Sequence, residues 1–325
     1  MKKVIDVPTI RDDNRGFELI LRLARLIMNE PKRHFDFNFQ HCSKLDHNGI
    51  VILGGLARYV DFQNSTTSRR LVSLFNSDAV ASAGVMFLVD SMSNLLSSTL
   101  IENNFLSHFS KSSFSGYPSG GYIGYREHNV SMDDDNIAEH LHSQWLSAEK
   151  LSVSESLKSH IVSRIFEIFM NAYGHGTTLQ PIDKLGVFSC GQYNKKEKKL
   201  CLSVLDFGLG VVETVRKFKA KKEISSVEAA KWALTKGNTT ATDTQESAIP
   251  RGLGFDLLKE FIVLNNGELR VYSNDICAFC SPSGDWQIEE LKIPFDGTLV
   301  SIKINCDGKH YRFSSEQNAS SKQYF

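Results

Sequence analysis

The sequence of this 325-residue chain lacks net charge, a long apolar run and a signal peptide. Its 37 basic and 37 acidic residues cancel, so long-range attraction to nucleic acid or to an anionic membrane is not expected. No stretch of about 18 apolar residues is present, which excludes a membrane-spanning helix. The first residues, MKKVIDVPTI, contain no apolar core of a signal peptide. We therefore expect a cytoplasmic protein.

Cysteine is also sparse. The six cysteines lie mostly inside apolar, strand-like stretches, which predicts reduced, buried thiols rather than disulfides. Cys277 and Cys280 form one close pair. A zinc site built on that pair would need a second pair or histidines at ligand spacing, and the neighbouring sequence has neither. The pattern favours structural thiols.

Apolar periodicity divides the chain into two halves, as its length leads us to expect. In the first half strands alternate with helices, an order that indicates an open α/β sheet. Its predicted elements are a helix over 17–29, a strand over 34–39, a helix over 50–60, a strand over 70–75 and a helix over 79–92. The predicted domain boundaries are 1–110 for the first domain, 111–150 for a linker and connecting helix, 151–306 for the second domain and 307–325 for a polar tail.

The stretch 110–135 is rich in serine, glycine and tyrosine and is predicted to be a connecting loop. Gly120 and Gly121 offer an alternative, a phosphate-binding turn, although no helical pattern follows them. A helix over 136–146 leads into the second half.

The second half begins with a capping-box pattern, Ser152-Val-Ser-Glu155, before a long helix. Two strands joined by a lysine-rich turn follow it. The remaining predicted elements are strands over 185–193 and 199–208, helices over 226–235 and 253–264, and strands over 268–273, 286–293 and 298–304.

Three polar residues of the long helix, Glu167, Asn171 and His175, recur every four positions and share one stripe beside the apolar face. A carboxylate at the edge of the core can deprotonate a nucleophile. An Asn oxygen can join the oxygen shell that Mg²⁺ prefers. Taken alone, the stripe is also compatible with a solvated helix face.

Two further motifs adjoin strands. Asp206-Phe-Gly208-Leu-Gly210 comes directly after a strand, where the carboxylate can accept a hydrogen bond from the amine of adenine. The glycines let the backbone turn tightly and approach a flat base. Gly297-Thr298 precedes the last strand, and its hydroxyl could support the aspartate through water. Each motif alone also describes an ordinary turn.

A fourth motif, Arg251-Gly252-Leu-Gly254-Phe255, opens a predicted helix. Glycine-rich backbone at a helix N-terminus offers N–H groups and the positive end of the dipole, which suit phosphate. A flexible helix entry is the alternative.

In this order E-x-x-x-N-A-x-x-H-G, DxGxG, RGLGF and GT resemble the motifs of the GHKL (histidine kinase-like) ATPases. That family includes gyrase, mismatch-repair and chaperone ATPases, histidine kinases and anti-sigma-factor kinases. The resemblance covers about residues 151–306. It implies a Bergerat-type domain, an α+β two-layer sandwich in which ATP lies between a helix layer and a mixed sheet.

By position, the resemblance implies that Glu167 activates water or a hydroxyl and that Asn171 ligates Mg²⁺. Asp206 would read the adenine amine, with Thr298 in support. The segment from Gly210 to Arg251, which contains NTTATDTQES, would be the lid over the triphosphate. The other residues implied in cofactor binding are His175, Gly208, Gly210, Arg251, Gly252, Gly254 and Phe255.

The NAxxHG ending is most similar to that of anti-sigma-factor kinases, and histidine kinases usually have Asn where Glu167 stands. Two functions stay open. The chain is a slow ATPase or protein-serine kinase, or it is a non-catalytic module in which ATP gates binding to a protein partner.

In the first half, FDFNFQHCSKLDHNGIVILGGLARYV is similar to the strand–loop–helix of STAS domains, the fold of anti-sigma-factor antagonists. The loop reads Asp46-His47-Asn48-Gly49, without the hydroxyl that is phosphorylated in that family, and Ser43 lies nearby. An unrelated small α/β domain is the alternative. The expected partner is this STAS-like domain or another protein, with no nucleic acid and no membrane. Dimerisation through the first half is a further alternative.

Overall fold

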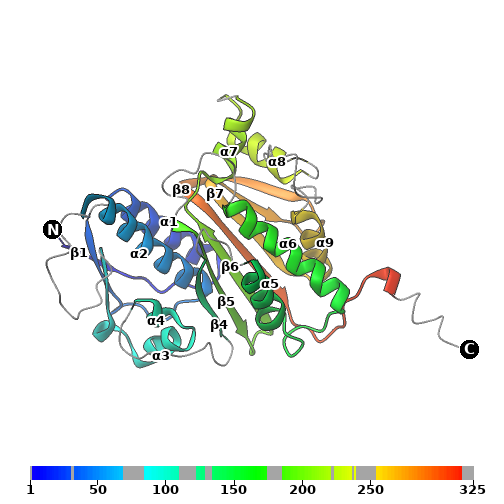
Figure 1. Ribbon diagram of the computed structural model, residues 1–325, viewed down its shortest axis with the longest axis horizontal. Coiled ribbons are helices and arrows are strands. Elements are labelled where there is room, and N and C mark those ends of the chain that lie inside the picture. The colour runs from blue at the N-terminus through cyan, green and yellow to red at the C-terminus, as the bar shows by residue number, and fades with distance from the viewer. Residues whose placement is uncertain are drawn as a thin grey trace, which may run out of the picture.

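The computed structural model describes residues 2–30, 33–68, 84–109, 122–128, 134–173, 185–220, 223–235, 238 and 254–316. These residues form a parallel sheet of three strands and an antiparallel sheet of five strands, with helices between and outside them (Figure 1). The mixed α/β, α+β sandwich class predicted from the sequence is confirmed.

The three-stranded sheet has the order β1 (Lys2–Asp6), β2 (His34–Asn38) and β3 (Val85–Leu88). Parallel neighbours need a crossover, and helices α1 (Asn14–Met28) and α2 (His47–Ser68) supply the two crossovers. Phe35 and Phe37 alternate with polar residues along β2 and are fully buried. The open α/β sheet predicted for this half is therefore confirmed, although β1 was not predicted.

The predicted helix over 79–92 is wrong in its described part. Residues 85–88 form β3, and Val89–Ser91 form a single 3-10 turn. Pairing with β2 and burial of Val85 outweigh the apolar content that suggested a helix. The predicted strand over 70–75 lies outside the described residues. Two short helices, α3 (Asn94–Glu102) and α4 (Phe105–Phe109), complete this half.

The five-stranded sheet has the order β4-β5-β6-β8-β7 and is antiparallel at every pairing. The expected mixed sheet is therefore wrong, because β5 and β6, like β7 and β8, are joined as hairpins. The loop predicted over 110–135 is wrong for the seven residues of edge strand β4. The bounds are Tyr122–His128 for β4, Val187–Asn194 for β5, Lys199–Asp206 for β6, Glu268–Cys280 for β7 and Trp286–Asn305 for β8.

Helices of the second half lie close to their predicted positions, with two differences. Helix α7 was not predicted, and the cap of α6 comes from Ser154, whose Oγ accepts from Leu157 N at 3.3 Å, rather than from Ser152. The bounds are Asp134–Glu139 for α5, His140–Trp145 for a π-helical turn, Glu155–Tyr173 for α6, Gly210–Phe218 for α7, Ser226–Leu234 for α8 and Gly254–Leu264 for α9.

The polar tail predicted over 307–325 was expected to fray, but residues 307–316 make defined contacts with the second half. Tyr311 forms a β-bridge with Val153 and accepts a hydrogen bond from Asn265 Nδ2 at 3.1 Å. Phe313 packs edge-on against His160. Residues 317–325 lie outside the described ranges. None of the helices described here is long and apolar enough to cross a membrane.

Helices α1 and α2 lie between the two sheets (Figure 1). The N-terminal part of α2 is apolar on all sides, with Ile50, Val51, Ile52 and Leu53 each at most 1% exposed. A helix buried all round has that composition. The opposite face of the five-stranded sheet is covered by α6 and α9, which enclose a second core. The central strands β5 and β6 are thus covered on both faces.

Strand β6 takes part in both cores. Leu200, Leu202 and Val204 point toward α6 and α9, whereas Leu205 points toward α2. Leu205 fits against Gly55 of α2, where an added Cβ would lie 2.5 Å from Leu205 Cδ2. The α/β layer and the sheet therefore share one close-packed interface.

We predict that Leu205→Ala lowers the free energy of unfolding by about 2–5 kcal/mol, because it leaves a cavity in this interface. Leu264→Ala is the matched control, since Leu264 is 71% exposed, and it should change stability by less than about 0.5 kcal/mol. Urea denaturation followed by circular dichroism measures both. Equal midpoints for the two variants would contradict the shared interface.

Candidate functional site

The directions in which α6, β6 and α9 run bring the predicted motifs to one end of the five-stranded sheet. Ser154, just before α6, donates its backbone N–H to Tyr311 O at 2.9 Å. Asn265, just after α9, bonds to Tyr311 Oη and to Asn305 O. Asn305 in turn pairs with Lys199, where β6 begins. The start of α6, the start of β6 and the end of α9 therefore share one end of the sheet.

It follows that Asn171 near the end of α6, Asp206 at the end of β6 and Gly254 at the start of α9 all lie toward the opposite end (Figure 1). These residues are far apart in the sequence. Their convergence follows from α6 running in the same direction as β6 while α9 runs in the opposite direction.

At that end, three polar residues form a row across adjacent strands. Asp206 on β6 pairs with Thr298 on β8, which pairs with Ser273 on β7. The residues two positions before or after them, such as Val204 and Val300, belong to the core under α6 and α9. Because side chains alternate along a strand, the row faces the helix layer.

Asp206 is 8% exposed, and its Oδ1 accepts a hydrogen bond from Gly208 N at 2.8 Å. This bond closes a tight turn within the DxGxG motif, in which the backbone of Gly208 returns to the Asp206 carboxylate. Thr298 Oγ1 lies 3.2 Å from Ser273 Oγ. Its predicted support of Asp206 through water stays a prediction.

Gly297 lies directly against this row. Its φ of +138° is one that side-chain-bearing residues rarely adopt, and an added Cβ would overlap the carbonyl oxygen of Asp206. The GT motif thus needs a glycine at this position, because β6 and β8 approach each other too closely at Asp206 to leave room for a side chain.

Sequence reasoning missed two residues of the site, Ser273 and Asn274. Ser273 Oγ accepts from Val211 N at 2.8 Å, and Asn274 Oδ1 accepts from Val212 N at 3.0 Å. Together they cap the N-terminus of α7. Asn274 adopts a φ of +54° where the β7–β8 register shifts. The polar interruption Ser-Asn-Asp in an otherwise apolar strand was the signal for this bulge.

Gly210 closes the DxGxG motif with a φ of +77°, and an added Cβ would overlap the side chain of Asn274. The glycine therefore allows Asn274 to reach the start of α7. The predicted lid begins here, and its described part is not irregular, because it contains α7 and α8. Helix α8 has a complete capping box between Ser225 and Glu228.

Glu167 lies at the edge of the core on α6, as predicted. It forms an ion pair with Arg164 one turn earlier, and the two side chains are 18% and 20% exposed. Burial raises the pKa of Glu167, and the guanidinium of Arg164 opposes that rise. Asn171, one turn further on, is exposed. A half-buried base next to an accessible amide suits proton abstraction beside a hydrated cation.

The start of α9 contributes Gly254 and Phe255. The Phe255 ring packs edge-on against Trp286, with ring centroids 5.7 Å apart. This contact fixes the first turn of the helix against the hairpin of β7 and β8. His175, Arg251 and Gly252 lie outside the described residues, as does NTTATDTQES apart from Asn238.

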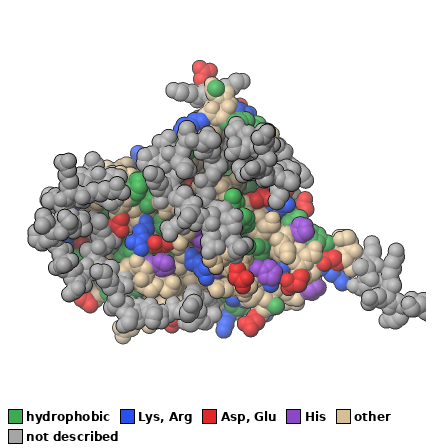
Figure 2. Space-filling model, viewed as in Figure 1, with side chains coloured by type: hydrophobic (Ala, Val, Ile, Leu, Met, Phe, Trp, Pro, Cys, Tyr) green, Lys and Arg blue, Asp and Glu red, His purple; other side chains and the backbone are tan. Residues whose placement is uncertain are grey.

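A separate cavity of about 340 Å³ lies between α1 and β8, lined by Arg22, Arg25, Leu26, Lys292, Ile293 and Pro294. Arg22 is already paired with Glu18 at 2.6 Å. On the face shown in Figure 2, acidic and basic side chains are interspersed rather than gathered by sign. The lining of this cavity thus carries three cationic side chains, Arg22, Arg25 and Lys292.

No family model matches this chain, and no curated protein is significantly similar to it.

We predict that Gly297→Ala destabilises the fold by about 3 kcal/mol or more, because it adds backbone strain and a collision with Asp206. Gly308→Ala is the matched control. Gly308 also has a positive φ, +78°, but an added Cβ would meet nothing within 4 Å. The control should cost about 1–2 kcal/mol. Equal losses in chemical denaturation would show that the approach of Gly297 to Asp206 is not tight.

Proposed function

We propose that this chain binds ATP with Mg²⁺ between the five-stranded sheet and helices α6 and α9, as GHKL-type proteins do. The observation that carries the proposal is the convergence of Asn171, Asp206, Gly254 and Thr298 at one end of the sheet. All of them belong to the motifs on which the resemblance rests. Asp206 and Thr298 also face the helix layer.

The residues fit the chemistry of this ligand. Asp206 offers a buried carboxylate to an exocyclic amine, next to the tightly turned backbone of Gly208. The first turn of α9 directs N–H groups and a positive dipole toward the same end of the sheet, which suits phosphate. Asn171 supplies an exposed amide oxygen for Mg²⁺.

Within this proposal we favour slow ATP hydrolysis or transfer of phosphate to a protein serine. Glu167 would hold the proton of the attacking water or hydroxyl. Mg²⁺, when bound, would neutralise charge on the phosphates. Arg164 keeps the Glu167 carboxylate fixed until then. Six free cysteines are consistent with the cytoplasmic location that we propose.

One observation favours the alternative, an ATP-gated interaction module. The face of the sheet opposite to the proposed nucleotide is packed directly on α1 and α2, through residues such as Leu205. Bound ATP would order the residues on the face of the sheet that contacts the nucleotide. That ordering could change the packing of the opposite face on α1 and α2, and thereby the surface of the STAS-like half. Coupling of this kind requires ATP to bind the two arrangements with different affinity. The partner would then be a protein that contacts the first half.

The binding proposal predicts that Asp206→Asn weakens ATP at least about tenfold, because a charged hydrogen bond to the base is lost. The variant keeps an oxygen for Gly208 N, so its fold should persist. Asp90→Asn, at an exposed position, is the matched control and should bind as the unmodified chain does. Isothermal titration with ATP and Mg²⁺ measures the affinity of the unmodified chain and of both variants. An absence of binding heat in the unmodified chain would refute the proposal.

The catalytic proposal predicts that Glu167→Gln lowers turnover about 10²–10⁴-fold and leaves ATP affinity unchanged. Because burial raises the pKa of Glu167, activity should fall at a higher pH than it would for an exposed glutamate. Arg164→Met removes the opposing cation, so the acid limb of the pH–rate profile should move to still higher pH. Arg22→Met, on α1, should leave the pH–rate profile unchanged.

An unmodified chain without turnover, but with partner binding that depends on ATP, would favour the ATP-gated interaction module.

A further inference from the structure

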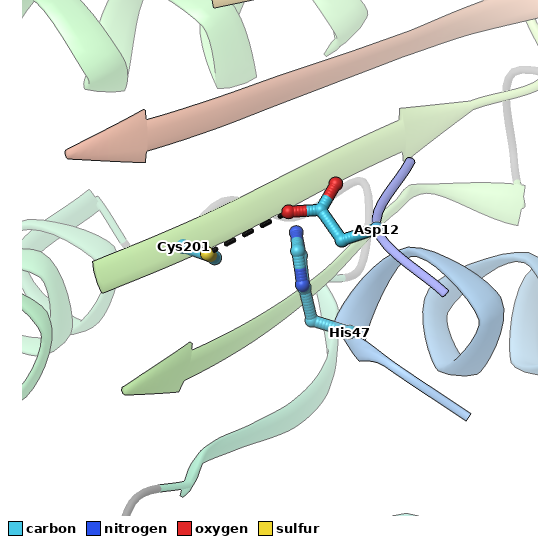
Figure 3. A group of neighbouring side chains, drawn as sticks. All are labelled: Asp12, His47 and Cys201. Carbon is cyan, nitrogen blue, oxygen red and sulfur yellow. Dashed lines mark hydrogen bonds between the residues drawn. The ribbon is translucent and has the colours of Figure 1, made fainter. Parts of the chain in front are cut away.

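A second cluster of side chains lies on the other face of β6, where the α/β layer meets the five-stranded sheet. Asp12 comes from the loop before α1, His47 is the first residue of α2, and Cys201 belongs to β6 (Figure 3). One ligand atom of each lies within 4.8 Å of the other two. The cluster is independent of the proposed nucleotide site, which lies on the opposite face at the end of the strand.

His47 is the member of the cluster whose polar atoms have no hydrogen-bond partner. The residue is 1% exposed, and neither of its ring nitrogens has a hydrogen-bond partner. Leaving a buried polar group unpaired destabilises the folded state, because its bonds to water are lost and not replaced. In Figure 3 the ring points toward Asp12 and Cys201. An imidazole in this position would recover that cost by binding a ligand between the three side chains.

Asp12 and Cys201 already contact each other on the side that faces the His47 ring. Cys201 Sγ donates to Asp12 Oδ2 at 3.8 Å. Given its usual bond lengths, a tetrahedral zinc ion places one sulfur, one nitrogen and one oxygen ligand about 3.3–3.6 Å apart. The sulfur–oxygen separation lies slightly above that range, so the three side chains would have to draw together around the ion.

The surrounding charges would accept a dication. Asp12 and Glu268 share the ammonium of Lys303, at 3.1 and 3.3 Å, and Asp46 pairs with Lys44 at 2.8 Å. Three carboxylates and two ammonium groups leave one negative charge. A zinc ion with a Cys201 thiolate adds one positive charge, so the occupied cluster would be neutral.

The burial of the cluster excludes the other chemistry that these residue types allow. A cysteine, a histidine and an aspartate can also form a nucleophilic triad. Cys201 is 6% exposed and lies beneath α1 and α2, so a substrate has no access to its sulfur. Small ions reach such sites during folding, because metal binding is coupled to folding.

We propose that Asp12, His47 and Cys201 bind one Zn²⁺ ion that fastens the α/β layer to the five-stranded sheet. Zinc would form bonds to Cys201 Sγ, a His47 ring nitrogen and an Asp12 carboxylate oxygen. The thiol proton leaves to solvent, Lys303 stays paired with Glu268, and a water molecule completes four-coordination. No electron is transferred. The ion is structural, because it joins ligands from two layers that also meet through apolar contacts and through ion pairs such as Lys303–Asp12 and Arg58–Glu127.

The test uses the full chain, reduced and stripped of metal with a chelator, and no nucleotide. Co²⁺ is added as the probe, since thiolate–cobalt bonds give a charge-transfer band in the near ultraviolet. We expect saturation at about one ion per chain and displacement of the band by Zn²⁺. Zn²⁺ should also raise the midpoint of thermal unfolding by mass action.

Cys201→Ser should abolish the band and weaken Zn²⁺ at least about 100-fold. Cys190→Ser is the matched control, because Cys190 is a buried thiol on the adjacent strand β5, outside the cluster. His47→Gln provides a second ligand variant that keeps Cys201, and it should also lower Zn²⁺ affinity. The proposal is overturned if the folded, unmodified chain gives no band, or if the band survives Cys201→Ser. Neither outcome bears on ATP binding.

Discussion

The register of strand β6 is the constraint on which both sites depend. Side chains alternate along a strand, so β6 sends Asp206 toward α6 and α9 and Cys201 toward the opposite face, where it contacts Asp12 just before α1. A shift of one residue would exchange the two sets and bury Asp206 against the apolar α2. The register is held on one side by Leu200, Leu202 and Val204 and on the other by Leu205. Apolar packing thus positions the polar residues that carry the proposed chemistry.

The parts of the fold that were predictable are those whose local pattern agrees with their tertiary environment. Strand β2, with Phe35 and Phe37 on one face, and helix α9 follow simple periodicities. Strands β3 and β4 do not. The first is too short to outweigh an apolar, helix-like neighbourhood, and the second carries Gly124 and polar residues typical of loops. Their strand conformation comes from pairing with β2 and β5, which are remote in sequence.

The motifs of the proposed nucleotide site were predictable from the sequence, but the hydrogen bonds that connect them to their neighbours were not. Glu167, Asp206 and Thr298 were identified because family motifs name them. Ser273 and Asn274 were missed, since their role is to cap α7 from a bulge in β7, more than 60 residues further along the chain. Asp12, His47 and Cys201 carry no common motif. They meet only because α2 packs across β5 and β6, which local sequence does not reveal.

The most direct test of the central claim is hydrogen exchange of the full chain with and without ATP and Mg²⁺. The account predicts slower exchange at the end of α6 around Asn171, in the segment 206–210 and in the first turn of α9. These segments share no stretch of sequence, so joint protection would report the site itself. Protection confined to the cavity lined by Arg22, Arg25 and Lys292, or no protection at saturating ATP, would contradict it.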